Sequence, residues 1–201
     1  PIDAVTWIQA TQYANWLSQQ KGLDPCYTYA ACPQDNQNCG GFAVSFAGLD
    51  CTGYRLPTEA EWESAARSPN VDHRWAGSDN PADVAQFNND DRDCRGTTIG
   101  QLDPNGYGLF DMSGNVREWV FDTLEVYRPT NNLREDPVID DGNQSVRVMR
   151  GGGCHDQPDV QDNDNYRHGR PVWHRESGVQ NNDYYGIGFR LVISRTGSCG
   201  N

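Results

Sequence analysis

The stretch GYRLPTEAEWESAAR, residues 53–67, is the most sharply marked element of the sequence and predicts a helix. Pro57 ends whatever precedes it, Thr58 stands at the N-cap position, and Glu61 completes a capping box three residues later. The apolar face at helical spacing consists of Trp62, Ala65 and Ala66.

A second helix is predicted on the N-terminal side, over residues 6–20 (TWIQATQYANWLSQQ). Thr6 and Gln9 form another capping box. The residues that recur at i, i+3, i+4 and i+7, and so should face the core, are Ala10, Tyr13, Ala14 and Leu17. Between the two helices, residues 22–53 are rich in Gly, Cys, Asn and Asp, which is typical of a disulfide-tied loop or small hairpin.

On the C-terminal side, the chain contains only short β-prone runs. They cover residues 116–120, 146–149 and 188–193. The polar stretch 68–108 has no regular pattern, and so long a stretch within one domain is usually ordered by function, metal or disulfide. Two helices followed by short strands on long loops indicate an α+β fold.

The composition points to one acidic, loop-rich domain covering residues 1–201. The chain carries 28 acidic against 16 basic residues, a net charge of −12, which would repel nucleic acid and anionic membranes and favour a cation as partner. No apolar run approaches the length of a membrane span, so we expect none. The length suits a single domain, and we expect a monomer.

Seven cysteines without zinc-ligand spacing favour disulfides in an oxidising compartment. The spacing leaves the connectivity open. We expect Cys26 to pair with Cys51 and Cys32 with Cys39, because each pair would close an irregular loop. The odd total leaves at least one thiol free or paired outside the chain. An extracellular, cell-surface or virion-surface location follows from this expectation.

Four motifs in order then suggest a family. They are GYRLPTEAEWESAAR (53–67), NGYGLFDMSGNVREW (105–119), RVMRGG (147–152) and GIGFRLV (186–192). Together with the opening helix they resemble the formylglycine-generating-enzyme, or sulfatase-modifying-factor, family. The resemblance implies a C-type-lectin-like fold, with two helices around a small mixed sheet and most residues in ordered loops.

The sequence departs from this family at its catalytic cysteines. The oxidising enzymes carry two cysteines after the RGG motif, which bind copper, whereas this chain offers Cys154 alone. One thiolate cannot supply a two-sulfur site for Cu(I), and the adjacent His155 would point to the opposite face of an extended strand. Iron chemistry would need a histidine cluster, and no HxxxH-type pair is present. We therefore assign no catalytic residue, and keep a copper oxidase acting on a peptide cysteine as the alternative.

The acidic turn LFDMSGNVREW is a candidate calcium site. Calcium takes carboxylate and carbonyl oxygens together. Family members carry the ion at the matching positions, which implies ligands from Asp111, Gly114, Val116 and Glu118. The alternative is structural: Asp111 would cap the turn, and Glu118 would pair with an arginine. A bound ion would brace loops rather than take part in chemistry.

Residues 153–185, between two apolar flanks, are rich in Asn, Asp, Tyr and His, with Arg and Trp interleaved. Such residues on a rigid scaffold suit ligand binding. The pattern resembles the variable proteins of diversity-generating retroelements, in which this segment is rewritten. The resemblance makes Arg150 and Arg190 scaffold. It gives as ligand-contacting positions His155, Asp156, Asn163, Asn165, Tyr166, His168, Trp173, His174, Asn181, Asn182, Asp183, Tyr184 and Tyr185.

The sequence therefore predicts a ligand-binding display protein, of receptor or adhesin type. Its partner would be a protein or glycan on another cell or a virus. Two alternatives stay open at this point: the copper oxidase, and a generic secreted sulfatase-modifying-factor-like module without catalysis.

Overall fold

The computed structural model describes residues 1–31, 42–69, 72–87, 98–125, 137–140, 145–154, 156 and 171–194. Its centre is a four-stranded sheet in the order β8-β7-β6-β9. The strands are β6 (Arg117–Thr123), β7 (Val146–Arg150), β8 (Glu176–Val179) and β9 (Ile187–Phe189). β7 runs antiparallel to β6 and β8, whereas β9 is parallel to β6. The sheet is therefore mixed, as predicted.

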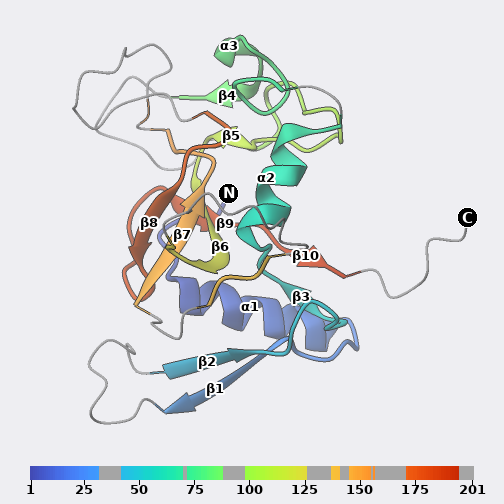
Figure 1. The fold of residues 1–201 in the computed structure, drawn as a ribbon, viewed down its shortest axis with the longest axis vertical. Helices are drawn as coiled ribbons and strands as arrows, with labels where there is room; N and C mark the ends of the chain where they lie inside the picture. The colour runs from blue at the N-terminus through green and yellow to red at the C-terminus, as the bar shows by residue number, and fades with distance from the viewer. Residues whose placement is uncertain are drawn as a thin grey trace, which may run out of the picture.

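The described residues form two longer helices and one short helix beside the sheet (Figure 1). They are α1 (Trp7–Gln20), α2 (Glu59–Arg67) and α3 (Pro81–Val84). Both capping boxes are confirmed: Thr6 with Gln9 begins α1, and Thr58 with Glu61 begins α2. The sequence pattern thus determined where both longer helices start, because the caps satisfy backbone N–H groups that have no partner within the helix.

The buried face of α1 differs from the prediction at Tyr13 and at Leu17, which is only half-buried. Ala10 and Ala14 are fully buried, but Tyr13 is exposed, and the buried stripe continues through Trp7 and Ser18 instead. Trp7 is fully buried, and its indole N–H donates to Val120 O of β6 at 2.9 Å. An isolated apolar spacing cannot distinguish the two neighbouring stripes of a helix when both carry aromatic residues.

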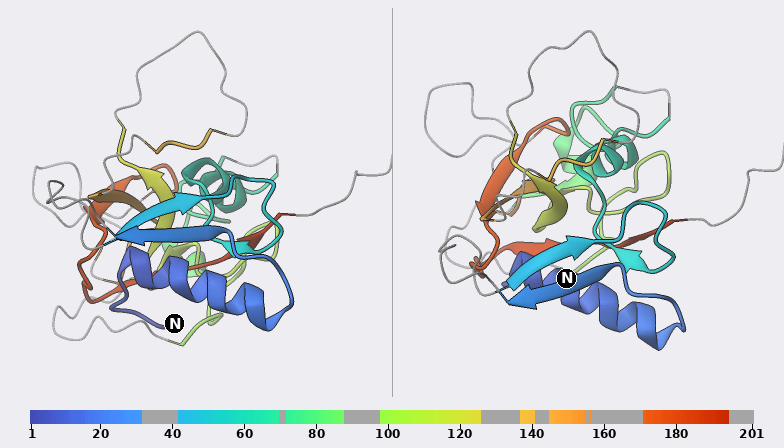
Figure 2. Two further views of the ribbon diagram at one scale, coloured as in Figure 1. Left: turned by 90° about the horizontal axis from the view of Figure 1, so that it is seen from below. Right: turned by 60° about the horizontal axis from the view of Figure 1, so that its bottom comes forward.

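Within the described residues, three two-stranded pairs accompany the central sheet. β1 (Tyr27–Ala31) and β2 (Phe42–Phe46) form an antiparallel hairpin, β3 (Tyr54–Arg55) pairs with β10 (Val192–Ile193), and β4 (Ala85–Gln86) pairs in parallel with β5 (Ser113–Gly114). The hairpin lies at one end of the long axis, and α3 and β4 at the other (Figure 1). Figure 2 shows the hairpin running alongside α1. The predicted β-prone run 188–193 is split between β9 and β10.

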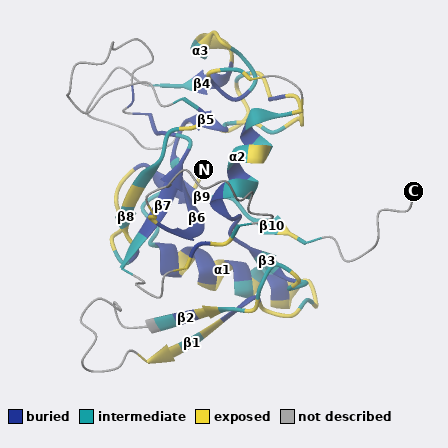
Figure 3. Cartoon of the chain, in the orientation of Figure 1, coloured by how far each residue is buried: buried dark blue, intermediate teal, exposed yellow. Residues whose placement is uncertain are grey.

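The buried residues gather on both sides of the central sheet (Figure 3). One cluster, between the sheet, α1 and the hairpin, contains Trp7, Trp119 and Phe121. Another contains Trp62 of α2, with Val120 and Val148 from the sheet. α2 therefore packs on the opposite face of the sheet from α1. This position brings α2 into contact with β6 and β7.

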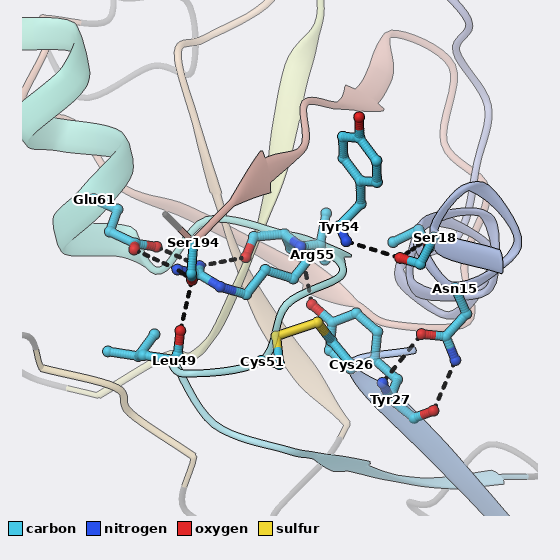
Figure 4. Close-up of a disulfide and its surroundings, with 12 residues drawn as sticks. Asn15, Ser18, Cys26, Tyr27, Leu49, Cys51, Tyr54, Arg55, Glu61 and Ser194 are labelled. Carbon is cyan, nitrogen blue, oxygen red and sulfur yellow. Dashed lines mark hydrogen bonds and ion pairs between the residues drawn. A yellow bond between two sulfur atoms is a disulfide. The ribbon is translucent and has the colours of Figure 1, made fainter. Parts of the chain in front are cut away.

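The disulfide between Cys26 and Cys51 is confirmed (Figure 4). It ties the hairpin to the chain beside Tyr27, which is fixed by Asn15 of α1 and whose hydroxyl accepts from Leu56 N at 2.9 Å. Burial raises the pKa of the Tyr27 hydroxyl, so it stays a neutral hydrogen-bonding group. The expected pair Cys32–Cys39 lies outside the described residues. Among the described helices, none is long and apolar enough to cross a bilayer.

Candidate functional site

Arg150 holds residues 172–174 of the candidate binding segment, just before β8. Its Nη1 donates to the carbonyls of Trp173 and His174 at 3.1 and 2.9 Å, and its Nη2 donates to Val172 O at 3.1 Å. One fully buried guanidinium thus holds three consecutive carbonyls. These contacts involve the backbone only, so they place no demand on the side chains at 173 and 174.

Acidic residues of α2 neutralise this arginine. Glu63 pairs with Arg150 Nη2, and Glu59 lies 3.4 Å from Arg150 Nη1. Glu59 also receives a two-point contact from Arg175, at 2.5 and 2.6 Å. The geometry is bidentate, the form in which an arginine–carboxylate pair is strongest. The sequence carries no local signal for this buried role of Glu59, because its arginine partners lie in distant segments of the chain.

Asp122 of β6 connects the first residue of α2 to Ile139. Its two oxygens accept from Glu59 N at 2.7 Å and from Ile139 N at 3.0 Å. Burial raises the pKa of the Asp122 carboxyl to about 6, an effect that the two backbone donors only partly offset.

Arg117, at the start of β6, forms a second fixed point. Its side chain pairs with Glu176 of β8 and, at 3.3 Å, with both oxygens of Asp156. Asp156 also accepts from Gly153 N at 2.7 Å and is only 1% exposed. The prediction that Asp156 contacts a ligand does not fit this position, because its carboxylate is buried against Arg117 and serves the scaffold.

The described exposed residues lie on either side of β8. Before the strand, the Trp173 side chain is 50% exposed and His174 is half-buried. After it, residues 181–185 cross from β8 to the start of β9, and Tyr184 and Tyr185 are 45% and 74% exposed. Asn181 is half-buried, whereas Asn182 and Asp183 are exposed. Arg117 contacts the residue that follows this second group and the first residue of β8: its backbone N–H donates to Gly186 O at 2.8 Å, and its side chain binds Glu176.

The segment was predicted as a loop face, but it contains the edge strand β8. Its residues alternate between half-buried and exposed, and its sequence, ESGV, has no apolar alternation to reveal a strand. The remaining predicted contact positions lie outside the described residues; they are His155, Asn163, Asn165, Tyr166 and His168. Seven of the predicted positions are thus placed at or near the surface, and Asp156 in the interior.

The acidic turn shows the predicted arginine pairing. Arg190 Nε and Nη2 donate to the two oxygens of Glu118 at 2.5 and 2.6 Å, and Trp62 Nε1 donates to the same carboxylate at 2.6 Å. Asp111 accepts from Gly100 N at 2.8 Å through one oxygen only. Both oxygens of Glu118 are therefore engaged, and a calcium ion would have to displace a charged donor from one of them.

Gly114 and Val116, the predicted carbonyl ligands, belong to the packed part of this turn. Gly114 has φ +77°, and a Cβ there would lie 2.5 Å from Gln86 O, so only glycine allows β4 and β5 to approach. Val116 is buried. No group of three or more His, Cys, Asp or Glu suited to an ion occurs among the residues that the structure describes. Calcium binding at this turn stays a prediction.

Cys154 follows the RGG motif and is fully buried. Its sulfur is disulfide-bonded. The thiol on which copper chemistry would depend is therefore oxidised in this structure.

The family follows from comparison with known proteins. The model of the sulfatase-modifying factor enzyme 1-like domain matches residues 1–195. The chain belongs to this family. The fold of this family member is C-type-lectin-like, as its motifs implied.

Individual relatives of this family member differ in their named roles. It is 33% identical over 144 residues to the chaperone protein LppX of Paenibacillus barcinonensis, covering 61% of this chain and 51% of the relative. It is 29% identical over 174 residues to the formylglycine-generating enzyme of Streptomyces coelicolor, covering 78% of this chain and 43% of the enzyme. The sulfatase-modifying-factor-like chain thus spans about half the length of these relatives.

Among solved structures, variable protein 1 of Treponema denticola superposes on this family member with a TM-score of 0.78 and 26% sequence identity. The superposition covers 97% of this chain and 71% of the treponemal one. The proteins similar to this chain thus include an enzyme, by sequence, and a protein named for its variability, by structure.

Proposed function

We propose that the chain is a ligand-binding display protein, of the type found as variable proteins of diversity-generating retroelements. The observation that carries the proposal is that segment 153–185 contains both buried residues that fix its position and exposed side chains that are free to contact a ligand. Its backbone and buried charges are held by Arg150, Glu59 and Arg117, while Trp173 and residues 181–185 are exposed. Similarity to the treponemal variable protein supports the same conclusion.

In this arrangement the residues that stabilise the fold are different from the exposed residues that would contact a ligand. Contacts to carbonyl groups do not depend on the side chain of the residue that supplies them, so the exposed positions can change without loss of the fold. Exposed Trp and Tyr supply large contact area at low entropic cost, and neighbouring Asn and Asp supply hydrogen bonds. The ligand is proposed to be a protein or glycan on another cell or a virus, bound by a monomer outside the cell.

Binding can be tested on arrays of glycans and of extracellular proteins. The chain would be compared with a face variant in which Trp173, Tyr184 and Tyr185 are replaced by Ala. The matched control replaces Tyr13 and Trp16, which are also exposed aromatic residues but lie on α1. We expect the face variant to lose the array signals and the control to retain them. Signals that survive in the face variant would contradict the proposal.

The coding region offers a second test. A near-copy of the sequence encoding residues 150–193, differing mainly at adenines and close to a reverse transcriptase, is expected. A gene without such a template would instead favour the generic secreted module.

The alternative function is oxidation of a peptide cysteine, which similarity to the Streptomyces enzyme favours. It requires a free Cys154, whereas this sulfur is disulfide-bonded. The test is incubation of the reduced chain with copper, oxygen and a CxPxR peptide. Turnover that disappears in Cys154→Ala would establish the enzyme and reject the binding protein as the sole function.

A further inference from the structure

β8 lies at one edge of the central sheet, with β7 as its neighbour among the described strands (Figure 1). Gln180 N donates to Ser145 O at 3.0 Å, which continues the antiparallel pairing one residue beyond the strand. Bonded and non-bonded residues alternate along such a ladder. The even-numbered residues of β8 therefore bond to β7, whereas the backbone N–H and C=O groups of Ser177 and Val179 point away from the sheet.

Three of these outward backbone groups are available to a ligand. The fourth, Val179 O, accepts from Asn182 N at 3.0 Å. Within the described part of the chain, Ser177 N, Ser177 O and Val179 N have no hydrogen-bond partner. The side chains at both positions are exposed, that of Val179 by 40%. Unpaired N–H and C=O groups along an exposed strand are a template for another extended chain.

The inward side of β8 is fixed by three distant elements. Glu176 pairs with an arginine of β6. A Cβ at Gly178 would lie 2.9 Å from Trp119 Cη2, so only glycine lets β8 pack so closely on this ring. Gln180 O accepts from the backbone N–H of the first residue of α1 at 3.0 Å. The outer edge is therefore held in its extended form before a ligand arrives, which lowers the entropic cost of pairing.

β8 lacks the residues that usually protect an edge strand from pairing. Its sequence, ESGV, contains no Lys or Pro, and its one charge, on Glu176, is paired. The strand is only four residues long, so an added strand would gain few hydrogen bonds from it. The rest of the affinity must come from neighbouring side chains. Trp173 precedes β8, and Tyr184 and Tyr185 follow it, all exposed.

We propose that the ligand binds as an extended segment of a protein, which adds a strand to the outer edge of β8. Ser177 supplies one donor and one acceptor, and Val179 supplies one donor. Trp173 and the two tyrosines contact side chains of the segment. An extended polypeptide presents N–H and C=O groups at the spacing of β8, which a glycan does not, so the free backbone groups favour a protein. This inference rests on the proposed function and specifies its class of ligand.

The probe is a phage-displayed library of linear random heptapeptides, selected on the chain, from which enriched peptides are synthesised. Ser177→Pro removes the outward N–H and places a ring in the path of the added strand. Proline is tolerated where an edge residue directs its nitrogen to solvent. The matched control, Ser177→Ala, removes the hydroxyl but keeps the N–H. We expect the proline variant to bind the peptides at least about tenfold more weakly, and the alanine variant to bind them within about twofold.

Amide hydrogen exchange tests the same edge in the unmodified chain, so it does not depend on how a variant folds. Ser177 and Val179 should exchange rapidly in the free chain and at least about tenfold more slowly with saturating peptide. Gly178, whose N–H faces β7, should be protected in both states and reports that β8 stays paired. Methylating the peptide amides one at a time should weaken binding only at alternate positions, because only every second residue of an added strand faces β8.

Three results would overturn the inference: no enriched peptide, unchanged exchange of both amides in the complex, or equal binding by the two Ser177 variants. Array signals that come from glycans alone, and disappear in the face variant, would reject an added strand while the proposed function stands. Protection of the two amides at high concentration without peptide would assign the edge to a second copy of this chain. Array signals that survive in the face variant contradict the proposed function itself, so the two failures are distinguishable.

Discussion

Two parts of the candidate binding segment are both rich in polar residues but differ in burial. One is its base, which includes Asp156, Arg175 and Glu176, and the other is the crossover from β8 to β9, residues 181–185. At the base, Arg175 and Glu176 are paired with Glu59 and Arg117, and Asp156 is buried. In the crossover, residues 181–185, the side chains of Asp183, Tyr184 and Tyr185 are exposed. Polar residues in one segment thus have two roles, and composition alone does not separate them.

The difference indicates that buried charges stabilise the fold as well as apolar packing does. We call Arg150, Arg117, Glu59 and their partners the frame of the segment. Arg150 lies over the ring of Trp62, 5.3 Å from its centroid, while it binds acids of α2 and carbonyls of the segment. A buried pair is a weak source of net stability, but breaking it leaves a charge without a partner. The frame should therefore be sensitive to substitution, and the crossover tolerant of it.

The largest expected effect on stability comes from Glu59→Ala. It removes the acid shared by Arg150 and Arg175, and we expect the free energy of unfolding to fall by about 3–5 kcal/mol. Urea denaturation measures the change. The matched control is Asp72→Ala, which removes an exposed partner of Arg67 and should cost no more than about 1 kcal/mol. Equal effects of the two substitutions would refute a buried-charge frame.

Removal of the Cys26–Cys51 disulfide should have the next largest effect. Replacing both residues with Ser frees a loop of 25 residues and should lower stability by about 2–4 kcal/mol. Because the hairpin packs on α1 and not on β8, array binding should survive at temperatures where the variant is folded. Loss of binding in the folded variant would show that the hairpin and the face are coupled.

The pH dependence of stability tests Asp122 within the frame. Its folded pKa of about 6 lies above its ordinary value of 3.8, so the folded protein holds this proton more tightly. Its contribution is fully present below about pH 4 and is lost as the pH rises through 6, by roughly 2–3 kcal/mol. Comparison with Asp122→Asn from pH 4 to 7 isolates it, since Asn does not titrate. A constant difference between the two proteins would contradict the shift.

The smallest expected effect on stability comes from the crossover. Tyr185→Ala should change the free energy of unfolding by less than about 0.5 kcal/mol, because the side chain is mostly exposed. Thermal denaturation of this variant beside Ile187→Ala, a buried neighbour in β9, gives the contrast. If Tyr185→Ala destabilised the protein as much as Ile187→Ala, residues 181–185 would contribute to stability and the prediction would be wrong.

Much of the fold could be predicted because its signals are local. Thr6 and Thr58 begin helices through contacts within four residues, and the disulfide of Cys26 closes a loop that the cysteine spacing already suggested. The candidate site was less predictable. Neither β8 nor the buried position of Asp156 could be inferred from the sequence, since both depend on strands and side chains far away along the chain.

The sequence by itself determined the two helices, the family and the segment in which polar and aromatic residues concentrate, because caps, motifs and composition are properties of neighbouring residues. Only the tertiary structure decided which of those polar residues are buried. Arg150, Arg117 and Glu59 meet their partners across 22 to 116 positions of the chain. The cost of burying a charge depends on whether an opposite charge lies within contact distance, and the folded chain alone sets that distance.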